Sequence, residues 1–562
     1  MFHVRKILCL FWQFDTIQIW ELITVRRIVL FILLIAMITV FIPAGTIASG
    51  YAAADFPDSV RVGLYYNSTA ANAVDIGCDG GLDISVHQSD TFGKLMTMAG
   101  GDTLQVVKDG YYTFSGGAYS RMETSQGAQA GPYHLQVSSC NSADDAGREA
   151  DSLRSQGYDA YPAYDGGYKV WVGSFLDASG AAQSGLDGDV VDGTKDTILV
   201  KRNGETVLAV VSDKNDELYF KPLSGNLSIA GKSYRGAVSF KRNSSSDMTV
   251  INILPLEEYL YGVIPNEMPP AWPQEALKAQ AVAARTYAVY NIINNGKFAS
   301  LGFDVGCSTD SQVYKGKSTE SAAANKAVDM TKGILMLHDG VPVEAFFYSH
   351  SGGYTADISD IYNSSSPVFV GKADPYSLGY APQYDGWSVT FSAADLLNKL
   401  MPTKGNIGNI DSVDMTHSYT GRVLEMDING TNGSAVMKKN ETRSVLGLKS
   451  TLFDMDTDSD VYTLDSAGQI KKSMPRDLFI IGGSGVNEFT GGNLYSMGNG
   501  AMKEIPGSPS LFTINGSGYG HGIGLSQYGA RGMADKGFNY TDILEYYYSN
   551  IEVYDTINGR NI

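Results

Sequence analysis

The chain has little cysteine, with four residues in 562: Cys9, Cys78, Cys140 and Cys307. There is no Cys-x-x-Cys pair, so we expect neither a zinc knuckle nor a dense disulfide framework, although one bridge between Cys78 and Cys140 remains compatible with the sequence. Basic residues are also few: 42 Lys and Arg stand against 60 Asp and Glu, and the formal net charge is −18. Because a nucleic-acid-binding protein needs a basic surface to neutralise phosphates, we expect no nucleic-acid partner.

Long apolar runs are scarce as well. The run near the N-terminus covers residues 28–42, which is shorter than the roughly twenty residues of a membrane-spanning helix. Arg26 and Arg27 precede this run, and alanines follow it at 52–54. The order basic, apolar, small is typical of a secretory signal. We therefore expect residues 1–54 to be a signal peptide or an uncleaved membrane anchor, and the rest of the chain to be exported.

Glycine and tyrosine are abundant, with 63 and 34 residues. This composition favours strands and turns, so the predicted fold class is α+β and mainly β. A compact unit is expected at 132–190, where strand-like segments at 133–138 and 168–175 accompany a helix at 143–156 that Gly157 ends. The order of these elements predicts a small unit of βαβ type.

The most prominent helix is predicted to start at Pro273, because apolar residues then recur at helical spacing until Gly296. Just ahead of it, Glu267 has four apolar neighbours: Ile264, Pro265, Met268 and Pro269. Apolar surroundings raise the pKa of a carboxyl, which suits a general acid. A second interpretation stays open at this point, in which Glu267 only complements the positive end of the helix dipole.

Three segments carry a family resemblance: residues 254–269, residues 276–288 and a Gly-rich stretch at 518–530. Together and in this order they resemble the stage II sporulation protein D/LytB family. Residues 346–355 and 446–451 match the family as well. Long motifs so far apart in one chain seldom occur together by chance, so the resemblance is specific.

The resemblance also divides the chain into domains. It covers residues 59–130 and 193–562, which implies a mainly β catalytic domain in two parts, with the prominent helix after the catalytic glutamate. Residues 132–190 resemble the SPOR domain, a small α+β module whose family binds glycan strands stripped of their peptides. A generic βαβ fragment is the alternative interpretation of this insert.

Members of the family act as lytic transglycosylases on the glycan strands of peptidoglycan. The glutamate of their Glu-Met-Pro motif, here Glu267, is the catalytic acid and base. Such enzymes need one carboxylate, whereas most glycosidases need two. The carboxyl protonates the oxygen that leaves and then accepts the proton of the sugar's C6 hydroxyl, so that cleavage between MurNAc and GlcNAc leaves a 1,6-anhydroMurNAc end. No cofactor is implied.

Four further residues are expected at the substrate. By resemblance Arg285 is a substrate-site residue, and its guanidinium would bind the lactyl carboxylate of stripped muramic acid. His521, Gln527 and Tyr528 belong to the Gly-rich stretch and are expected to bind the glycan, the first two through hydrogen bonds. The glycines there lack dinucleotide-binding spacing, and we expect them to let the backbone approach a sugar chain closely.

No metal is expected. Some family members have a Cys/His cluster before a Gln-Val-Tyr segment, and they are thought to hold zinc. In the matching stretch 303–314, Cys307 is the one cysteine, and Asp310 and Ser311 stand where His and Cys would be. One thiol does not make a four-ligand zinc site.

Two other functions remain open from the sequence. Some relatives are described as modifiers of autolytic amidases, so the chain would then be a non-catalytic wall-binding protein with a cell-wall amidase as its partner. Simple hydrolysis, with water in place of the C6 hydroxyl, is the third option. All three place the protein in the cell wall or on the outer face of the membrane.

Overall fold

The computed structural model describes residues 56–562, apart from 89–90, 116–117, 213–215, 243–245, 465, 476–477, 483–484, 490–491 and 499. The predicted signal or anchor at 1–54 lies outside the described residues. Within the described part of the chain, no helix is long and apolar enough to cross a membrane. Cys78, Cys140 and Cys307 are free thiols, so Cys78 and Cys140 are not bridged.

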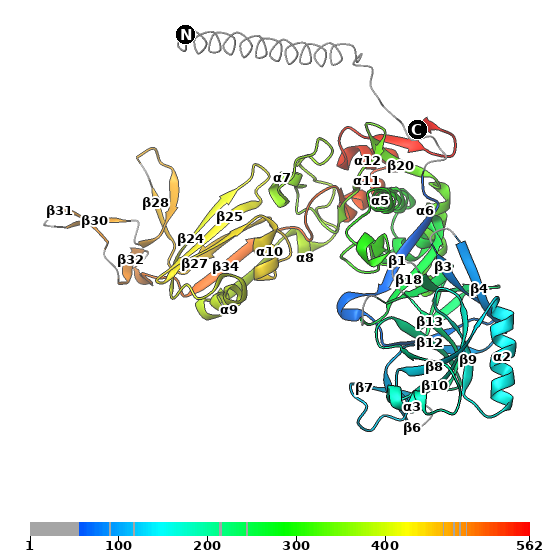
Figure 1. Ribbon diagram of the computed structural model, residues 1–562. Helices are drawn as coiled ribbons and strands as arrows, with labels where there is room; N and C mark the ends of the chain where they lie inside the picture. The colour runs from blue at the N-terminus through cyan, green and yellow to red at the C-terminus, as the bar shows by residue number, and fades with distance from the viewer. Residues whose placement is uncertain are drawn as a thin grey trace, which may run out of the picture. The chain divides into compact units, whose positions relative to one another are not determined.

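Two large sheets dominate the first half of the described chain (Figure 1), and the predicted α+β, mainly β class is confirmed. The seven-stranded sheet has the order β19 (Val305–Gly306), β1 (Ser59–Tyr65), β18 (Thr249–Pro255), β17 (Ala237–Lys241), β14 (Asp216–Pro222), β3 (Leu82–Gln88) and β4 (Thr91–Met98). The ten-stranded sheet has the order β11 (Asp189–Asp192), β8 (Tyr133–Cys140), β10 (Tyr168–Phe175), β9 (Ala160–Tyr164), β13 (Glu205–Val211), β12 (Thr197–Arg202), β5 (Thr103–Lys108), β2 (Ala73–Gly77), β15 (Leu227–Ile229) and β16 (Lys232–Tyr234).

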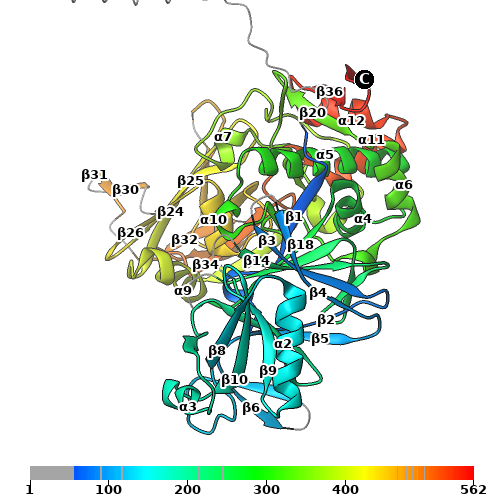
Figure 2. The same ribbon diagram turned by 45° about the vertical axis from the view of Figure 1, so that its right-hand side comes forward.

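The helix and strands predicted within 132–190 are present. β8 and β10 pair antiparallel, and α2 (Ala143–Ser155) lies along β8, β9 and β10 (Figure 2). Ser142 caps α2 by accepting a hydrogen bond from the Asp145 N–H, and Gly157 follows the helix with a φ of +92°. A small apolar cluster joins α2 to the strands: Ala146, Ala150, Ala160, Val170 and Val172.

This unit shares its sheet with the rest of the chain. β9 runs parallel to β13, with Ala163 beside Ala209 and Tyr164 beside Val210. β13 in turn pairs with β12, and β12 with β5. The unit is therefore continuous with the neighbouring strands through backbone hydrogen bonds.

A buried ion pair crosses the same junction. The side chains of His134 on β8 and of Asp109 just after β5 are fully buried, and His134 Nε2 lies 2.7 Å from Asp109 Oδ2. His134 Nδ1 lies 2.7 Å from the Gly173 carbonyl, so both ring nitrogens face acceptors, as an imidazolium requires. Burial lowers the pKa of His134, but the Asp109 carboxylate more than offsets this and holds the pKa above its ordinary value.

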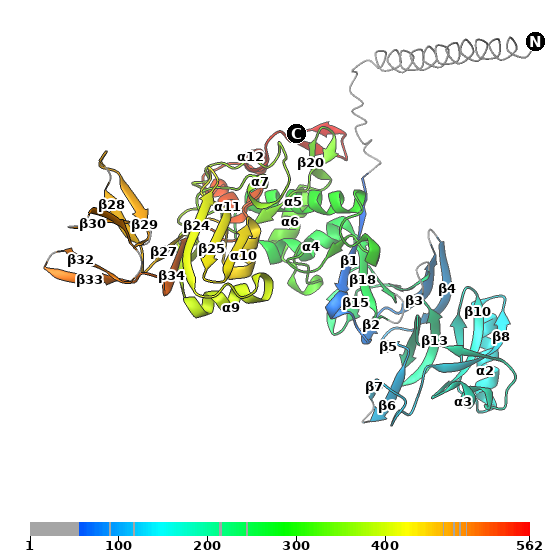
Figure 3. The same cartoon turned by 60° about the vertical axis from the view of Figure 1, so that its left-hand side comes forward.

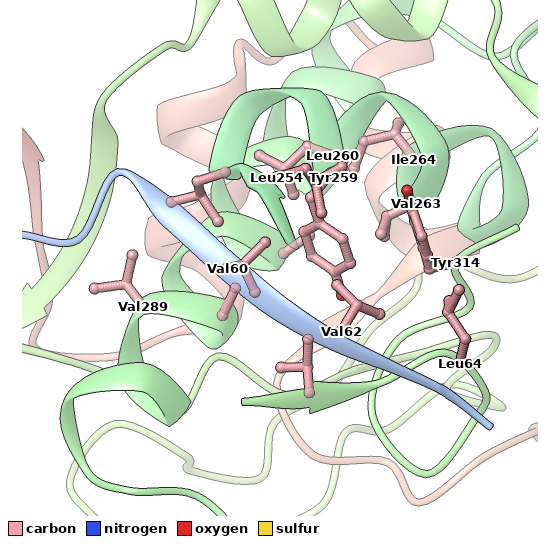
Figure 4. Close-up of a cluster of buried hydrophobic side chains, with 14 of the residues drawn as sticks. Val60, Val62, Leu64, Leu254, Tyr259, Leu260, Val263, Ile264, Val289 and Tyr314 are labelled. Atoms are coloured by element: carbon pink, nitrogen blue, oxygen red, sulfur yellow. The ribbon is translucent and has the colours of Figure 1, made fainter. Parts of the chain in front are cut away.

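Three helices pack against one another beside the seven-stranded sheet: α4 (Leu256–Glu267), α5 (Gln274–Ile293) and α6 (Ala322–Met330). Pro273, the predicted start of this helix, is the N-cap of α5, so the helix begins one residue later, at Gln274. Figure 4 shows the apolar cluster that joins β1 to α4, with Val60, Val62, Leu64, Tyr259, Leu260, Val263 and Ile264 among its members. This packing holds the C-terminal end of α4 in a fixed position.

Residues 387–516 contain a further β unit with its own apolar core. One sheet has the order β23 (Trp387–Ser392), β34 (Leu511–Gly516) and β27 (Phe453–Thr457); the second has the order β24 (Ile410–His417), β25 (Val423–Gly430) and β26 (Gly433–Lys438). Helices α9 (Ala393–Lys404) and α10 (Asn440–Leu446) pack against each other there. Three hairpins lie between β27 and β34 in the chain (Figure 3): β28 (Val461–Leu464) with β29 (Ile470–Ser473), β30 (Phe479–Gly482) with β31 (Gly485–Glu488), and β32 (Leu494–Gly498) with β33 (Ala501–Ile505).

The C-terminal segment returns to the helices. β22 (Phe347–Tyr348) runs parallel to β35 (Leu525–Ser526), and β20 (Ile334–His338) pairs with β36 (Glu552–Asp555). The remaining elements are β6 (Tyr111–Ser115), β7 (Ala118–Met122), β21 (Val341–Pro342), β37 (Arg560–Asn561), α3 (Ala178–Ala182), α7 (Ile358–Ile361), α8 (Pro382–Asp385), α11 (Gln527–Asp535), α12 (Tyr540–Tyr547) and short 3-10 helices at Asn67–Thr69, Ala299–Leu301 and Lys317–Thr319.

The His134–Asp109 pair predicts a pH-dependent stability. His134→Gln should lower the free energy of unfolding by about 3 kcal/mol near about pH 6, because it leaves the buried Asp109 charge uncompensated. The folded pKa of His134 is raised, so the pair's stabilisation is complete below the unfolded pKa of about 6.5 and is lost as pH rises through the folded pKa. Urea unfolding of the wild type and of His134→Gln across this pH range should show that the difference in their free energies of unfolding shrinks as pH rises. A difference independent of pH contradicts the imidazolium.

Candidate functional site

Glu267 is the last residue of α4, and donors from two distant segments hold its carboxyl. The Val313 N–H donates to Oε1 at 2.8 Å, and the Gln527 side-chain amide donates to Oε2 at 3.2 Å. The sequence placed Glu267 ahead of a helix, but the structure places it at the negative, C-terminal end of α4. The interpretation that Glu267 complements a helix N-terminus is therefore wrong.

The environment of Glu267 suits proton transfer in both directions. Burial raises the pKa of its carboxyl above the usual range, and the hydrogen bonds from Val313 and Gln527 oppose that rise only in part. Burial thus favours the neutral acid, while the two donors stabilise the carboxylate that remains after a proton has left. A group that must first give and then accept a proton needs both states to be accessible.

Glu267 lines a cleft of about 770 Å³, a volume typical of ligand sites. His521 and Gln527 line the same cleft, so the structure brings these three predicted residues together. Five tyrosine side chains share the lining: Tyr287, Tyr290, Tyr348, Tyr362 and Tyr519. Aromatic rings present apolar faces and polar hydroxyls, a combination suited to the faces and edges of sugars.

The parallel pairing of β22 with β35 brings the Gly-rich stretch to this cleft. Phe347 lies beside Leu525 and Tyr348 beside Ser526, immediately before Gln527. A Cβ at Gly522, where φ is +92°, would lie 2.5 Å from the guanidinium of Arg422. These glycines therefore allow close packing within the protein, whereas the sequence led us to expect a close approach to sugar.

His521 has no ring nitrogen free for a sugar. Its Nε2 lies 3.0 Å from the Phe347 carbonyl, and its Nδ1 accepts the Ile523 N–H at 3.1 Å. Burial lowers the pKa of His521 to about 4, and the positive charge of Arg443 adds to this effect, so the ring is neutral. The predicted hydrogen bond from His521 to the glycan is wrong. What remains is a ring that forms part of the cleft wall.

Gln527 and Tyr528 follow each other in the chain but have different surroundings. The Gln527 amide donates to Glu267 and lies 3.5 Å from the buried side-chain oxygen Oε1 of Gln280, so its shortest contact is with the catalytic candidate. The Tyr528 ring packs 4.9 Å from the Trp272 ring and 5.5 Å from the His350 ring. The ring of Tyr384 in α8 lies 6.2 Å away, so the structure places Tyr528 in an aromatic group and not against the Glu267 carboxyl.

Arg285 binds a carboxylate of the protein itself. Its side chain is 1% exposed, and its Nε and Nη2 donate to the two carboxylate oxygens of Glu257 at 2.8 and 2.7 Å. Further donors reach the Ile334 carbonyl at 3.2 Å and the Val328 carbonyl at 3.3 Å. The prediction that Arg285 binds a lactyl carboxylate is wrong, because its guanidinium already donates to the Glu257 carboxylate inside the protein.

Several groups of the cleft were not predicted from the sequence. Glu344 and Arg443 line it, and burial raises the pKa of the Glu344 carboxyl. Glu344 lies two residues before the matching segment 346–355, and Arg443 three residues before the matching segment 446–451. Their place beside these segments was the available signal. The Val313 N–H, being a backbone group, has no signature in a sequence.

The residues around Cys307 do not fit a zinc site. The Cys307 thiol points to the Leu64 carbonyl, and burial raises its pKa, whereas zinc binds the thiolate. Asp310, which stands in the place of a ligand, accepts a hydrogen bond from the Tyr66 hydroxyl at 2.7 Å. Across the part of the chain that the structure describes, no group of three His, Cys, Asp or Glu side chains could hold a metal.

Arg285→Ala and Glu257→Ala should each destabilise the fold by about 3–5 kcal/mol, because each leaves one charge of a largely buried pair uncompensated. Glu258→Ala is the matched control on the same helical turn. The Glu258 side chain is 37% exposed and its nearest cation, Arg235, is 3.9 Å away, so this change should cost less than about 1 kcal/mol. Denaturant unfolding measures all three. An Arg285→Ala protein of unchanged stability that fails to bind glycan would restore the substrate role.

Comparisons with known proteins agree with these observations. The family model "Stage II sporulation protein" matches residues 244–338, and the SPOR domain model matches residues 129–184. The amidase enhancer of Bacillus subtilis is 31% identical over 411 residues, which are 69% of this chain and 53% of that protein, so the chain spans about half its length. Stage II sporulation protein D of Bacillus amyloliquefaciens is 30% identical over 324 residues, which are 55% of this chain and 76% of that protein. Stage II sporulation protein D of Bacillus subtilis is 28% identical over 331 residues, which are 56% of this chain and 79% of that protein. The chain therefore belongs to the stage II sporulation protein D family of sporulation and cell-wall proteins, and it carries a SPOR domain.

Proposed function

We propose that this protein is an exported lytic transglycosylase that cleaves peptidoglycan glycan strands, preferably stripped of peptides, between MurNAc and GlcNAc. The observation that carries the proposal is the carboxyl of Glu267, which lies in a cleft of about 770 Å³ and has a raised pKa. Its two hydrogen-bond donors support the same role. The chemistry is the one that the family resemblance implies.

In the proposed reaction, protonated Glu267 gives its proton to the glycosidic oxygen as the bond between that oxygen and the anomeric carbon breaks. The carboxylate that remains is stabilised by the Val313 N–H and the Gln527 amide. It then takes the proton of the muramic C6 hydroxyl, whose oxygen forms a new bond to the anomeric carbon. Glu267 regains its proton, one C–O bond has replaced another, and no water is consumed.

The SPOR domain is proposed to bind the same polymer. Residues 132–190 are the predicted glycan-binding insert, and the matching model covers most of them. The two-part catalytic domain, 59–130 and 193–562, surrounds this insert in the chain. Export places both in the cell wall or on the outer face of the membrane.

A second candidate function rests on the 31% identity to an amidase enhancer. In that case the protein would bind the wall without cutting glycan and would raise the activity of a cell-wall amidase partner. Glu267 would then be structural. Simple hydrolysis by water is the third candidate.

Glu267→Gln should reduce cleavage of peptide-stripped strands by at least about a hundredfold, because it keeps the volume of the side chain and removes only the proton that moves. Glu258→Gln, on the same helix but outside the cleft, is the matched control and should cleave as the wild type does. Mass analysis of the products identifies the reaction. Ends lighter by one water support the proposal, ordinary reducing ends indicate a hydrolase, and no cleavage by the wild type favours the amidase enhancer.

The rate of cleavage should depend on the protonation of Glu267. The acid form acts first, so the rate falls as pH rises through the pKa of Glu267, which is raised above the usual range of a glutamate. Gln527→Met removes a donor that lowers this pKa, so the fall should move to higher pH. A pH–rate profile measured on stripped strands tests this. A profile that stays in place, or moves to lower pH, contradicts the assignment of the acid to Glu267.

A further inference from the structure

Two cations line the cleft that holds Glu267, and only one of them has a partner in the described part of the chain. The Lys297 ammonium donates to the Asp310 carbonyl and lies 4.8 Å from the centre of the Phe298 ring. The Nε of Arg443 is buried and, among the described residues, has no hydrogen-bond partner. Such a buried donor is unfavourable while it has no partner, and an acceptor on a ligand bound in the cleft would satisfy it.

Arg422, a neighbouring arginine, also has a buried Nε without a partner among the described residues, but it does not line the cleft. It is fully buried, and its guanidinium donates to the Tyr354 carbonyl at 2.9 Å and to the Thr451 hydroxyl at 3.3 Å. Gly522 packs directly against it. Arg422 thus packs against the Gly-rich stretch inside the protein, whereas Arg443 lines the cleft.

The setting of Arg443 is fixed. It lies in α10, and Lys439 just before this helix donates to the Tyr362 carbonyl at 3.0 Å and to Asn363 at 2.8 Å. Burial lowers the pKa of Arg443, and the nearby hydroxyls of Tyr519 and Tyr362 oppose this effect. No carboxylate of the described residues forms an ion pair with Arg443, so its charge is available to an anion.

The shape of a guanidinium defines the ligand. It binds a carboxylate through two parallel hydrogen bonds. In a glycan strand of alternating GlcNAc and MurNAc, the one carboxylate is that of the lactyl group on MurNAc. This group is a free anion only where the stem peptide has been removed, because the peptide bond converts it to an uncharged amide.

We propose that Arg443 binds the free lactyl carboxylate of MurNAc, so that the cleft itself selects peptide-stripped strands. This inference rests on the proposed function, since it assumes that the cleft takes a glycan strand. It assigns to Arg443 the contact that the sequence suggested for Arg285. Arg443 is thus a specificity-determining residue, while Glu267 carries out the proton transfers.

The test measures binding without cleavage. Full-length Glu267→Gln protein is titrated by calorimetry with soluble stripped glycan oligosaccharides, and with the same oligosaccharides after their carboxylates have been converted to amides. The free carboxylates should bind roughly ten- to a hundredfold more tightly, as expected for one charge-assisted bidentate pair. Adding Arg443→Gln should abolish this difference, and adding Arg443→Lys should retain part of it.

The matched control is Lys438→Gln in the same Glu267→Gln background. Lys438 ends β26, immediately before Lys439 and α10, and its exposed ammonium pairs with Glu425 at 2.9 Å, so the preference should not change. Equal binding of both oligosaccharides by the parent, or an unchanged preference in Arg443→Gln, overturns the proposal. If Arg443→Gln fails to fold, an unchanged preference in Arg443→Lys overturns it too.

The outcome also separates this inference from the proposed function. If the wild type cleaves no strand while the preference for free carboxylates depends on Arg443, the transglycosylase proposal fails and the binding proposal stands. If the wild type cleaves free and amidated strands at equal rates, the carboxylate contact at Arg443 is refuted while the transglycosylase proposal stands.

Discussion

The bidentate pair between Arg285 and Glu257 connects three elements on which the site depends. Glu257 lies in the first turn of α4, and Arg285 lies in the middle of α5. The same guanidinium also donates to the carbonyl of Ile334, the first residue of β20. With the pair formed, the apolar face of α4 can pack on β1 and the opposite end of the helix is held still. A carboxyl can keep a perturbed pKa only while its surroundings hold their shape, so the geometry at Glu267 depends on this ion pair at the far end of the same helix.

Local structure was well predicted from the sequence because local signals determine it. Gly157 ends α2 where expected, and the strands at 133–140 and 168–175 follow their alternating apolar residues. The apolar neighbours of Glu267 predicted a raised pKa, and the described structure does show its carboxyl in surroundings that raise the pKa. Its catalytic role was predicted from the family resemblance. Such features need only a few consecutive residues.

Long-range contacts escaped the sequence analysis for a physical reason. The helical spacing shows on which face of the helix Arg285 lies, but it does not show which carboxylate its guanidinium binds. A buried protein carboxylate and a sugar carboxylate suit a guanidinium equally well. Glu267 and Gln527 are 260 residues apart, and the parallel pairing of β22 with β35, which lies immediately before Gln527, involves two residues from each strand. Pairings this short have almost no pattern in the sequence.

The shared sheet of the SPOR domain has a consequence for how a long polymer is handled. Two binding modules joined by a flexible chain meet their ligand at separations that vary with the linker. Here β9 is hydrogen-bonded to β13, so the spacing between the SPOR domain and the following strands is set by a sheet. With glycan bound to the SPOR domain, the neighbouring strands would lie at a set number of sugar units along the polymer. The shared sheet would then fix the distance along the glycan between the SPOR domain and the rest of the protein.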